Sequence, residues 1–228
     1  PWIMCKCLRF LQYFKEPEGP EWDKLEKCLN QILFNVQDTE NVNKANAEYA
    51  VTFEAMNLVV SWGPASTENA THSELRSKTH TLLGKYIAVR DANVRYLALD
   101  MLARVSKVDG HADVQQYQDI VCSCLSEADM SVQKRALDVI FVITDAGIVE
   151  YVVSELISAL STAESDIREE IVVKAAILAE RYQDNIQWYL DSMIEMIVLA
   201  GDHVAEAVWY RIVHVVTNAP DVHEYAAR

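Results

Sequence analysis

Apolar residues recur at helical spacing along most of the chain, with charged residues between them. Steps of three and four residues place such side chains on one face of an α-helix. The pattern therefore predicts amphipathic helices that each bury a single stripe. The clearest stripe consists of Trp22, Leu25, Leu29, Ile32 and Val36.

The same periodicity predicts eleven helices joined by short loops. A first helix over Pro1–Phe14 ends at the breaker 15–20, and a short segment from His223 begins a twelfth. The longest break, 61–72, contains Gly63 and several small polar residues and is predicted to be a flexible surface loop. After the helix that starts at Trp22, the predicted helices cover 45–61, 73–88, 92–106, 112–126, 131–144, 148–160, 167–183, 186–200 and 203–217.

An internal repeat links the second helices of successive hairpins. Val94, Val132, Ile167 and Val204 occupy equivalent positions, so the repeats lie 35 to 38 residues apart. Repeats of this length with two helices each indicate an all-α, right-handed α-solenoid of HEAT or armadillo-like hairpins. We expect residues 1–228 to be one solenoid segment cut from a longer trunk, and to self-associate through its terminal hairpins.

A polar residue precedes the helix in each repeat, where a carboxylate can accept hydrogen bonds from free backbone N–H groups. We therefore predict helix caps at these positions. They are Asp91, Asp129, Glu164 and Gly201-Asp202.

Composition and charge support a helical protein that does not bind nucleic acid. The chain has 228 residues, is 51% hydrophobic, has only 6 Gly and 5 Pro, and carries a formal charge of −14. Its richest basic region is interleaved with acidic residues, which favours a solvated helix face over a lipid-binding patch. The basic residues are Arg76, Lys78, Lys85, Arg90, Arg95, Arg104 and Lys107, and the acidic ones are Glu74, Asp91, Asp100 and Asp109.

No catalytic, cofactor-binding or metal-binding residue is assigned, and no cofactor is expected. HExxH, Gly-rich phosphate loops, GxSxG and paired CxxC motifs are absent from the sequence. The scattered His residues, including His80, His203 and His214, are predicted to have structural or surface roles. The adjacent Glu169 and Glu170 are predicted to stabilise the positive end of a helix dipole.

Five cysteines without a disulfide pattern favour a reducing, cytoplasmic setting. Cys5 and Cys7, like Cys122 and Cys124, are two residues apart, so on a continuous helix their side chains diverge by about 200° and cannot share a metal. We predict that these four are core thiols.

Two aromatic pairs are candidate contact residues for partners. They are Trp188-Tyr189 and Trp209-Tyr210, and we predict that at least one ring of each pair lies in the core.

Longer segments resemble the adaptins, the large subunits of clathrin adaptor complexes. The stretches PWIMCKCLRFLQ, ANAEYAVTFEAM and VRYLALDML resemble adaptins in general. DIREEIVVKAAILAERY from Asp166, WYLDSMIEMI and AGDHVAEAVWYRIVHVV resemble the α type. The similarity runs in order along nearly the whole chain, and the break at 61–72 is longer than in animal members.

The resemblance implies a non-catalytic scaffold of the endocytic adaptor at the cytosolic face of the plasma membrane, in clathrin-coated pits. Its implied partners are a β-adaptin, a medium chain and a small chain, with the clathrin coat reached indirectly. Phosphoinositide and dileucine-cargo sites would lie in trunk regions before Pro1, and the hinge and appendage after Arg228. Another solenoid scaffold, such as a different vesicle-coat subunit or a nuclear transport carrier, is the alternative that periodicity alone leaves open.

Overall fold

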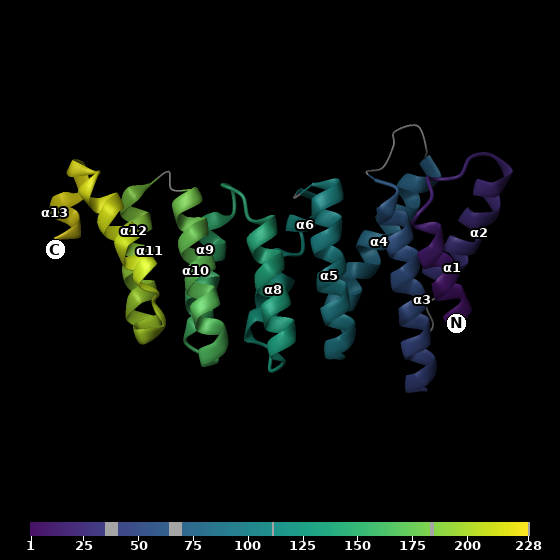
Figure 1. Cartoon of the computed structure of the whole chain (residues 1–228), viewed down its shortest axis with the longest axis horizontal. Coiled ribbons are helices and arrows are strands. Elements are labelled where there is room, and N and C mark those ends of the chain that lie inside the picture. Colours follow the sequence, from purple (N-terminus) through teal and green to yellow (C-terminus); the bar gives the residue numbers. More distant parts are fainter. Residues whose placement is uncertain (35–40, 64–69, 111, 183–184, 228) are drawn as a thin grey trace. The chain divides into compact units, whose positions relative to one another are not determined.

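The chain folds into α-helices and short 3-10 turns, with no strand among the residues described. This computed structural model describes residues 1–34, 41–63, 70–110, 112–182 and 185–227. Figure 1 shows the helices of the chain, labelled in order. The chain divides into two compact units, Pro1–Val114 and Gln115–Arg228. The prediction of an all-α fold is confirmed.

Unit 1 is built around α3, a long helix that packs against α1, α2, α4 and α5. Ala55, Met56, Leu58 and Val59 of α3 are completely buried. Burying each large apolar side chain stabilises the fold by about 1.5–3 kcal/mol, so α3 carries much of the core of this unit. Its helices are α1 Trp2–Leu11, α2 Pro20–Phe34, α3 Val42–Ser61, α4 Ala70–Ile87 and α5 Ala92–Asp109.

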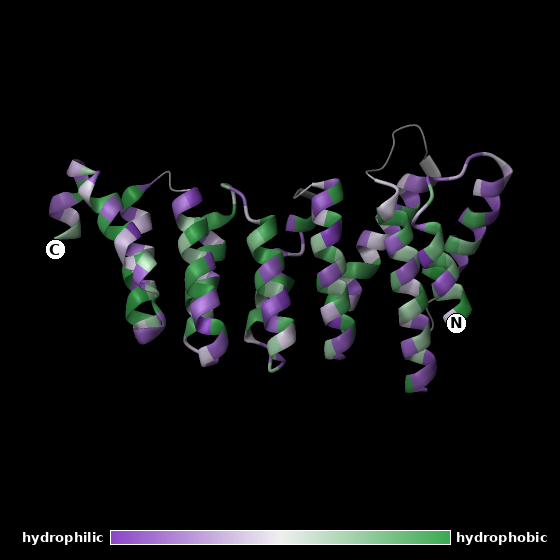
Figure 2. Cartoon of the chain, viewed as in Figure 1, coloured by the Kyte–Doolittle hydropathy of each residue, from purple (hydrophilic) through white to green (hydrophobic). Residues whose placement is uncertain are grey.

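Unit 2 has its core between α9 and α10, with α8 and α11 packed beside them. Apolar and polar faces alternate around these helices (Figure 2). The short α6, Ala112–Gln115, lies at the boundary between the units. The helices that follow it are α7 Gln118–Ser123, η1 Cys124–Ser126, α8 Met130–Ile143, α9 Val149–Leu160, α10 Ser165–Arg181, α11 Ile186–Ala200, η2 Gly201–His203, α12 Glu206–Thr217, η3 Pro220–Val222 and α13 His223–Ala226.

Two of the four predicted caps are present. Asp91 accepts hydrogen bonds from the backbone of Asn93 and Val94 at 2.8 and 3.3 Å, and Asp129 caps α8 in the same way. The side chain of Glu164 makes no cap bond to α10, and Ala205, not Gly201 or Asp202, precedes α12. The prediction was wrong there because an effective cap needs a short side chain or Gly directly before the first turn.

The predicted helix 112–126 was also wrong, since it is divided into α6, α7 and η1. Gln115 donates one hydrogen bond to the Ile143 carbonyl at 3.3 Å and another to Asp145 at 2.6 Å. These bonds fix the end of α6 to the end of α8, and the chain turns before α7 starts. The apolar spacing continues across the turn, so it gave no sign of the break.

The predicted surface loop 61–72 was too long, because α4 begins at Ala70 and His72 is a buried helical residue. Residues 64–69 lie outside the described part of the chain. Each of the other predicted helices overlaps one observed α-helix, with ends shifted by a few residues.

Candidate interaction surfaces

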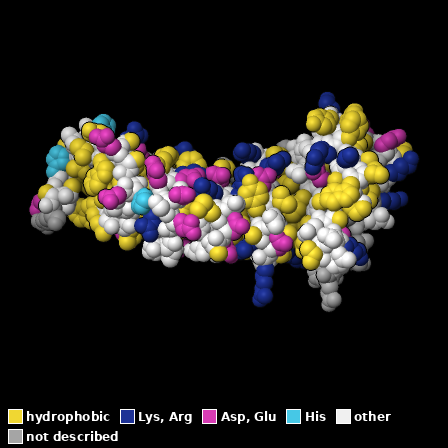
Figure 3. Space-filling view, turned by 60° about the horizontal axis from the view of Figure 1, so that its bottom comes forward, with side chains coloured by type: hydrophobic (Ala, Val, Ile, Leu, Met, Phe, Trp, Pro, Cys, Tyr) yellow, Lys and Arg dark blue, Asp and Glu magenta, His cyan; other side chains and the backbone are white. Residues whose placement is uncertain are grey.

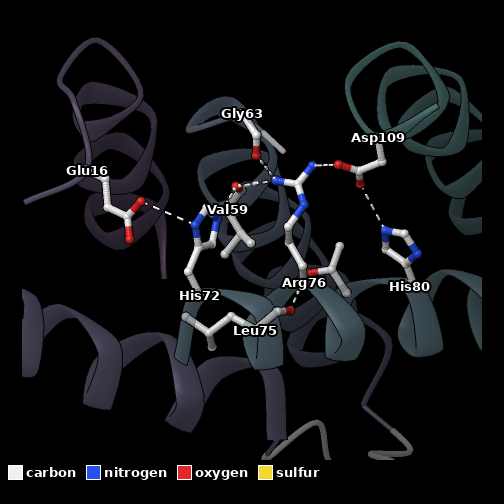
Figure 4. Close-up of polar contacts among 9 residues, drawn as sticks. Glu16, Val59, Gly63, His72, Leu75, Arg76, His80 and Asp109 are labelled. Carbon is white, nitrogen blue, oxygen red and sulfur yellow. Dashed lines mark hydrogen bonds and ion pairs between the residues drawn. The ribbon is translucent and has the colours of Figure 1, made fainter. Parts of the chain in front are cut away.

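Arg76 is a buried cation that joins three segments of unit 1. Its side chain is 4% exposed, and its guanidinium donates hydrogen bonds to the carbonyls of Val59, at 3.1 Å, and Gly63 (Figure 4). These carbonyls belong to the end of α3 and the turn after it, where backbone acceptors have no partner within the helix. The other end of the guanidinium pairs with Asp109.

Asp109 is the last residue of α5 and is itself 7% exposed. One carboxylate oxygen accepts from Arg76, and the other lies 3.1 Å from Nε2 of His80 (Figure 4). Because Arg76 and His80 are one turn apart on α4, the carboxylate fastens that helix at two points. A buried charge of this kind persists only where it is paired, as it is here.

His72 completes the cluster one turn before Arg76. Its Nε2 lies 3.3 Å from the Val59 carbonyl and its Nδ1 3.2 Å from a carboxylate oxygen of Glu16, which precedes α2 (Figure 4). The ring packs edge-on against Trp22 and Trp62, with centroids 6.3 and 5.9 Å away. His72 thus connects the α1–α2 linker with α3 and α4.

The charges of the cluster compensate one another, and Arg76 and His72 bind the end of α3 while Asp109 ends α5. Arg76 was predicted to be part of a solvated basic face, and that prediction was wrong. Other members of the region do lie outside the core: Arg104 pairs with Asp100 at 3.1 Å, and the Lys78 ammonium lies 4.0 Å from the Phe34 ring centroid. Sequence reasoning missed the Arg76–Asp109 pair because the partners are 33 residues apart.

Unit 2 carries ion pairs between successive second helices. Lys174 of α10 donates to Asp138 of α8 at 2.6 Å and lies 2.8 Å from Glu170. Burial lowers the pKa of Lys174, but the hydrogen bonds to the two carboxylates outweigh burial, and the net shift is upward. Glu180 of α10 accepts from Nε of Arg211 of α12 at 2.7 Å. These pairs tie α8, α10 and α12 together.

Exposed apolar side chains are concentrated on α1 in unit 1 and on α11 and α12 in unit 2. Hydrophobic side chains appear at the surface among the charged ones in Figure 3. Such patches are the usual sites of protein contact. The residues are Trp2, Ile3, Met4 and Phe10, with Tyr13 and Phe14 just after α1, and Ile194, Val198, Leu199, Trp209, Tyr210 and Val213.

A groove with a volume of about 560 Å³ also opens in unit 1 among α1, α2 and α3. Met4, Ile32 and Val51 provide apolar walls, and Lys44 and Glu48 lie at the polar side. The exposed Lys44 and the half-buried Glu48 lie 3.7 Å apart as an ion pair one helical turn apart. The groove therefore offers a mainly apolar surface with one charged pair at its edge.

The burial of the two aromatic pairs agrees with the prediction for the first pair but not for the second. Tyr189 is 1% exposed, so the first pair has its predicted core ring. Trp209 and Tyr210 are 46% and 66% exposed, so the prediction of a core ring was wrong for the second pair. In α12 only Val208 is buried, and the helix therefore presents most of its apolar residues outward.

The thiols and the remaining candidate side chains have ordinary structural positions. Cys5, Cys122 and Cys124 are buried as predicted, but Cys7 is exposed, so its prediction was wrong. Cys122 lies in α7 and Cys124 is the first residue of η1, so the two buried thiols do not belong to one continuous α-helix. Burial raises the pKa of Cys122 to about 12, and that thiol is therefore a poor nucleophile.

The predicted helix-dipole role of Glu169 and Glu170 needs correction. Both fall in the second turn of α10, because that helix starts at Ser165, and Glu170 pairs with Lys174. His203 lies in η2 and His214 in α12. Within the described segments, no three His, Cys, Asp or Glu side chains are grouped as metal ligands, and no helix there is long and apolar enough to cross a bilayer.

Comparison with known proteins identifies the family. A family model described as the adaptin N terminal region matches residues 1–228. The chain belongs to this adaptin family. Over the whole length of this chain, the adaptin is 39% identical to AP-2 complex subunit alpha-1 of Arabidopsis thaliana. The matched region covers 22% of that relative. It is 36% identical to AP-2 complex subunit alpha-2 of Dictyostelium discoideum. That match covers 100% of this chain and 23% of the relative.

The resemblance to the α type is confirmed by these identities. AP-1 complex subunit gamma-2 of Arabidopsis thaliana is less similar, at 33% identity over the whole adaptin chain and 25% of the relative. The chain thus spans a quarter or less of the length of these curated relatives.

Proposed function

We propose that this adaptin is a non-catalytic scaffold of an endocytic clathrin adaptor complex of the AP-2 type. Residues 1–228 would act as one solenoid segment that holds a β-adaptin, a medium chain and a small chain. The observation that carries the proposal is the identity across the whole chain to the AP-2 alpha subunits of Arabidopsis thaliana, 39%, and Dictyostelium discoideum, 36%, compared with 33% to an AP-1 gamma subunit of Arabidopsis thaliana.

The arrangement of side chains supports scaffolding. Helix ends are fastened by Arg76 and Asp109 in unit 1, and by Lys174 and Arg211 across the helices of unit 2. Such ties keep neighbouring helices in register, while apolar residues on α1, α11 and α12 stay at the surface. A protein that holds partners needs this combination of a fastened interior and accessible contact residues.

The proposed location is the cytosolic face of the plasma membrane, in clathrin-coated pits. Coat, phosphoinositide and dileucine-cargo contacts are proposed to be made through other parts of the adaptor. The residues described here contribute support for the partner chains rather than a ligand pocket. Domain-scale flexing between packed hairpins would accompany opening and closing of the adaptor.

The proposal is tested by tagging the protein at its own gene, purifying it and identifying what copurifies. Stoichiometric recovery of a β-adaptin, a medium chain and a small chain supports it. A parallel purification of an AP-1 type adaptin from the same cells is the matched control and should bring down a different medium chain. Recovery of nuclear transport cargo or subunits of another coat would overturn the proposal.

A further inference from the structure

Arg181 is an exposed cation of unit 2 that is held in place by aromatic rings rather than by a carboxylate. Its guanidinium carbon lies 5.4 Å from the ring centroid of Phe141 and 5.9 Å from that of Tyr182. The residue belongs to the last turn of α10, where a positive charge also suits the helix dipole. Contact with a ring face leaves the N–H donors at the edge of the guanidinium available to an anion.

The two rings are themselves fixed to the framework. Phe141 is half-buried on α8, and the hydroxyl of Tyr182 donates a hydrogen bond to the Thr144 carbonyl at 3.1 Å. Arg181 therefore lies on a support formed by the ends of α8 and α10. A guanidinium supported in this way loses little side-chain freedom when it binds an anion, which favours affinity.

Arg181 differs in its contacts from most other basic residues of unit 2. Within the described part of the unit, only Arg181 and the exposed Lys134 bind neither a carboxylate nor a backbone carbonyl. Residues 115–228 carry 19 of the 34 acidic residues but only 7 of the 20 basic ones, so a shortage of carboxylates does not explain this. The basic residues that do bind one of these groups are Arg135, Arg168, Lys174 and Arg211.

An exposed apolar side chain lies next to Arg181 on the surface of α10. Ile177 precedes Arg181 by one helical turn and is 41% exposed. The helices on both sides of it are present in unit 2: Lys174 joins α10 to α8, and Glu180 joins α10 to α12 (Figure 1). Because Ile177 is three residues from each of these two ties, its side chain emerges between them.

A guanidinium with available donors beside an apolar side chain complements a carboxylate beside an aliphatic one. Arginine is also enriched among the residues that contribute most to protein interfaces. A membrane surface or a nucleic acid would instead require several free cations, and the acidic balance of unit 2 opposes both. The surface therefore favours an acidic protein as its partner.

We propose that Arg181 and Ile177 form a contact site for an acidic surface of a partner protein. A carboxylate of the partner binds the guanidinium, and an aliphatic side chain next to that carboxylate packs on Ile177. Loss of the guanidinium should weaken the interaction roughly tenfold or more, because the bond is charge-assisted. The inference rests on the proposed scaffold function and deepens it, since it names a surface through which the chain holds a partner.

The first test identifies the occupant by cross-linking. A photo-cross-linking phenylalanine analogue replaces Ile177 in the tagged protein in its own cells, and mass spectrometry identifies the cross-linked peptide after irradiation. We expect a peptide of another protein in which Asp or Glu lies close to an aliphatic residue. The analogue at Tyr151, which is 40% exposed on α9, is the matched control and should not capture this peptide. A cross-link to lipid or to another copy of this chain, or no cross-link, would overturn the proposal.

A charge swap then tests the ion pair itself. Arg181→Glu should weaken binding of the 228-residue chain to the captured partner at least tenfold, as measured by biolayer interferometry. Changing the partner's carboxylate to Lys should restore binding to this variant. Lys134→Glu is the matched control, because it makes the same change of charge on exposed α8 surface, and it should alter the dissociation constant less than twofold. Wild-type affinity of Arg181→Glu, or a swap that restores nothing while circular dichroism shows intact helices, would contradict the proposal.

Copurification of the wild-type protein separates this inference from the function on which it rests. If the wild type recovers no adaptor chains, the scaffold function itself is wrong. If adaptor chains copurify with it but the cross-link and the charge swap both fail, the scaffold function stands and only the contact site at Arg181 is wrong.

Discussion

Arg76 and Asp109 form a buried ion pair that fastens the first half of α4 to the end of α5. The same guanidinium binds two carbonyls at the end of α3, so one side chain holds three helices of unit 1 together. Buried pairs are costly to create but more costly to break, because a single remaining charge lies in a poorly solvated place. The stability of unit 1 should therefore depend on both partners at once.

Arg76→Met should lower the free energy of unfolding of unit 1 by about 3–5 kcal/mol, because it leaves Asp109 buried without its cation. Combining Arg76→Met with Asp109→Leu should recover part of that loss. Urea unfolding followed by tryptophan fluorescence gives the measurement, since Trp22 and Trp62 lie beside the cluster. Arg104→Met is the control: its side chain is 61% exposed, and the change should cost less than about 1 kcal/mol.

The predicted caps provide a second comparison. Asp129→Ala should destabilise unit 2 by about 1 kcal/mol, because its carboxylate accepts from the backbone of Ser131 and Val132. Glu164→Ala should change the free energy of unfolding much less, since that side chain caps nothing. Thermal denaturation monitored by circular dichroism would show the difference, and equal losses in both variants would contradict it.

Local patterns predicted the helices well because each contains its own apolar stripe, as in the helix beginning at Trp22. They also predicted the caps at Asp91 and Asp129, where all contacts lie within three residues. The Arg76 cluster and the division of 112–126 depend on partners about 30 residues away, which periodicity does not report. Trp209 and Tyr210 are large aromatic residues, so the sequence suggested that one of them lies in the core. Whether a helix face is buried depends on which other helices cover it, and the sequence of α12 alone does not contain that information.

High pH should destabilise unit 2 through Tyr189. Burial raises its pKa to about 12, whereas an unfolded tyrosine titrates near 10. The neutral phenol is therefore favoured by folding, and this stability is complete below pH 10 and is lost as the pH rises toward 12. Urea unfolding at pH 9, 10 and 11 should show a decline that Tyr189→Phe reduces. An identical pH dependence in that variant would show that other groups cause the decline.

Lys174 should contribute more than an ordinary surface lysine because it is 16% exposed and lies between Asp138 and Glu170. Lys174→Met keeps most of the apolar stem but removes both charge-assisted hydrogen bonds, so we expect a loss of about 1–2 kcal/mol. Lys134→Met on exposed α8 surface is the matched control and should change the free energy of unfolding by less than about 0.5 kcal/mol. Because α10 is joined to α8 through this lysine, hydrogen exchange should also accelerate in both helices of the Lys174 variant. If hydrogen exchange accelerated only in the turn of α10 that contains the substitution, the ion pair would stabilise α10 alone and would not couple the two helices.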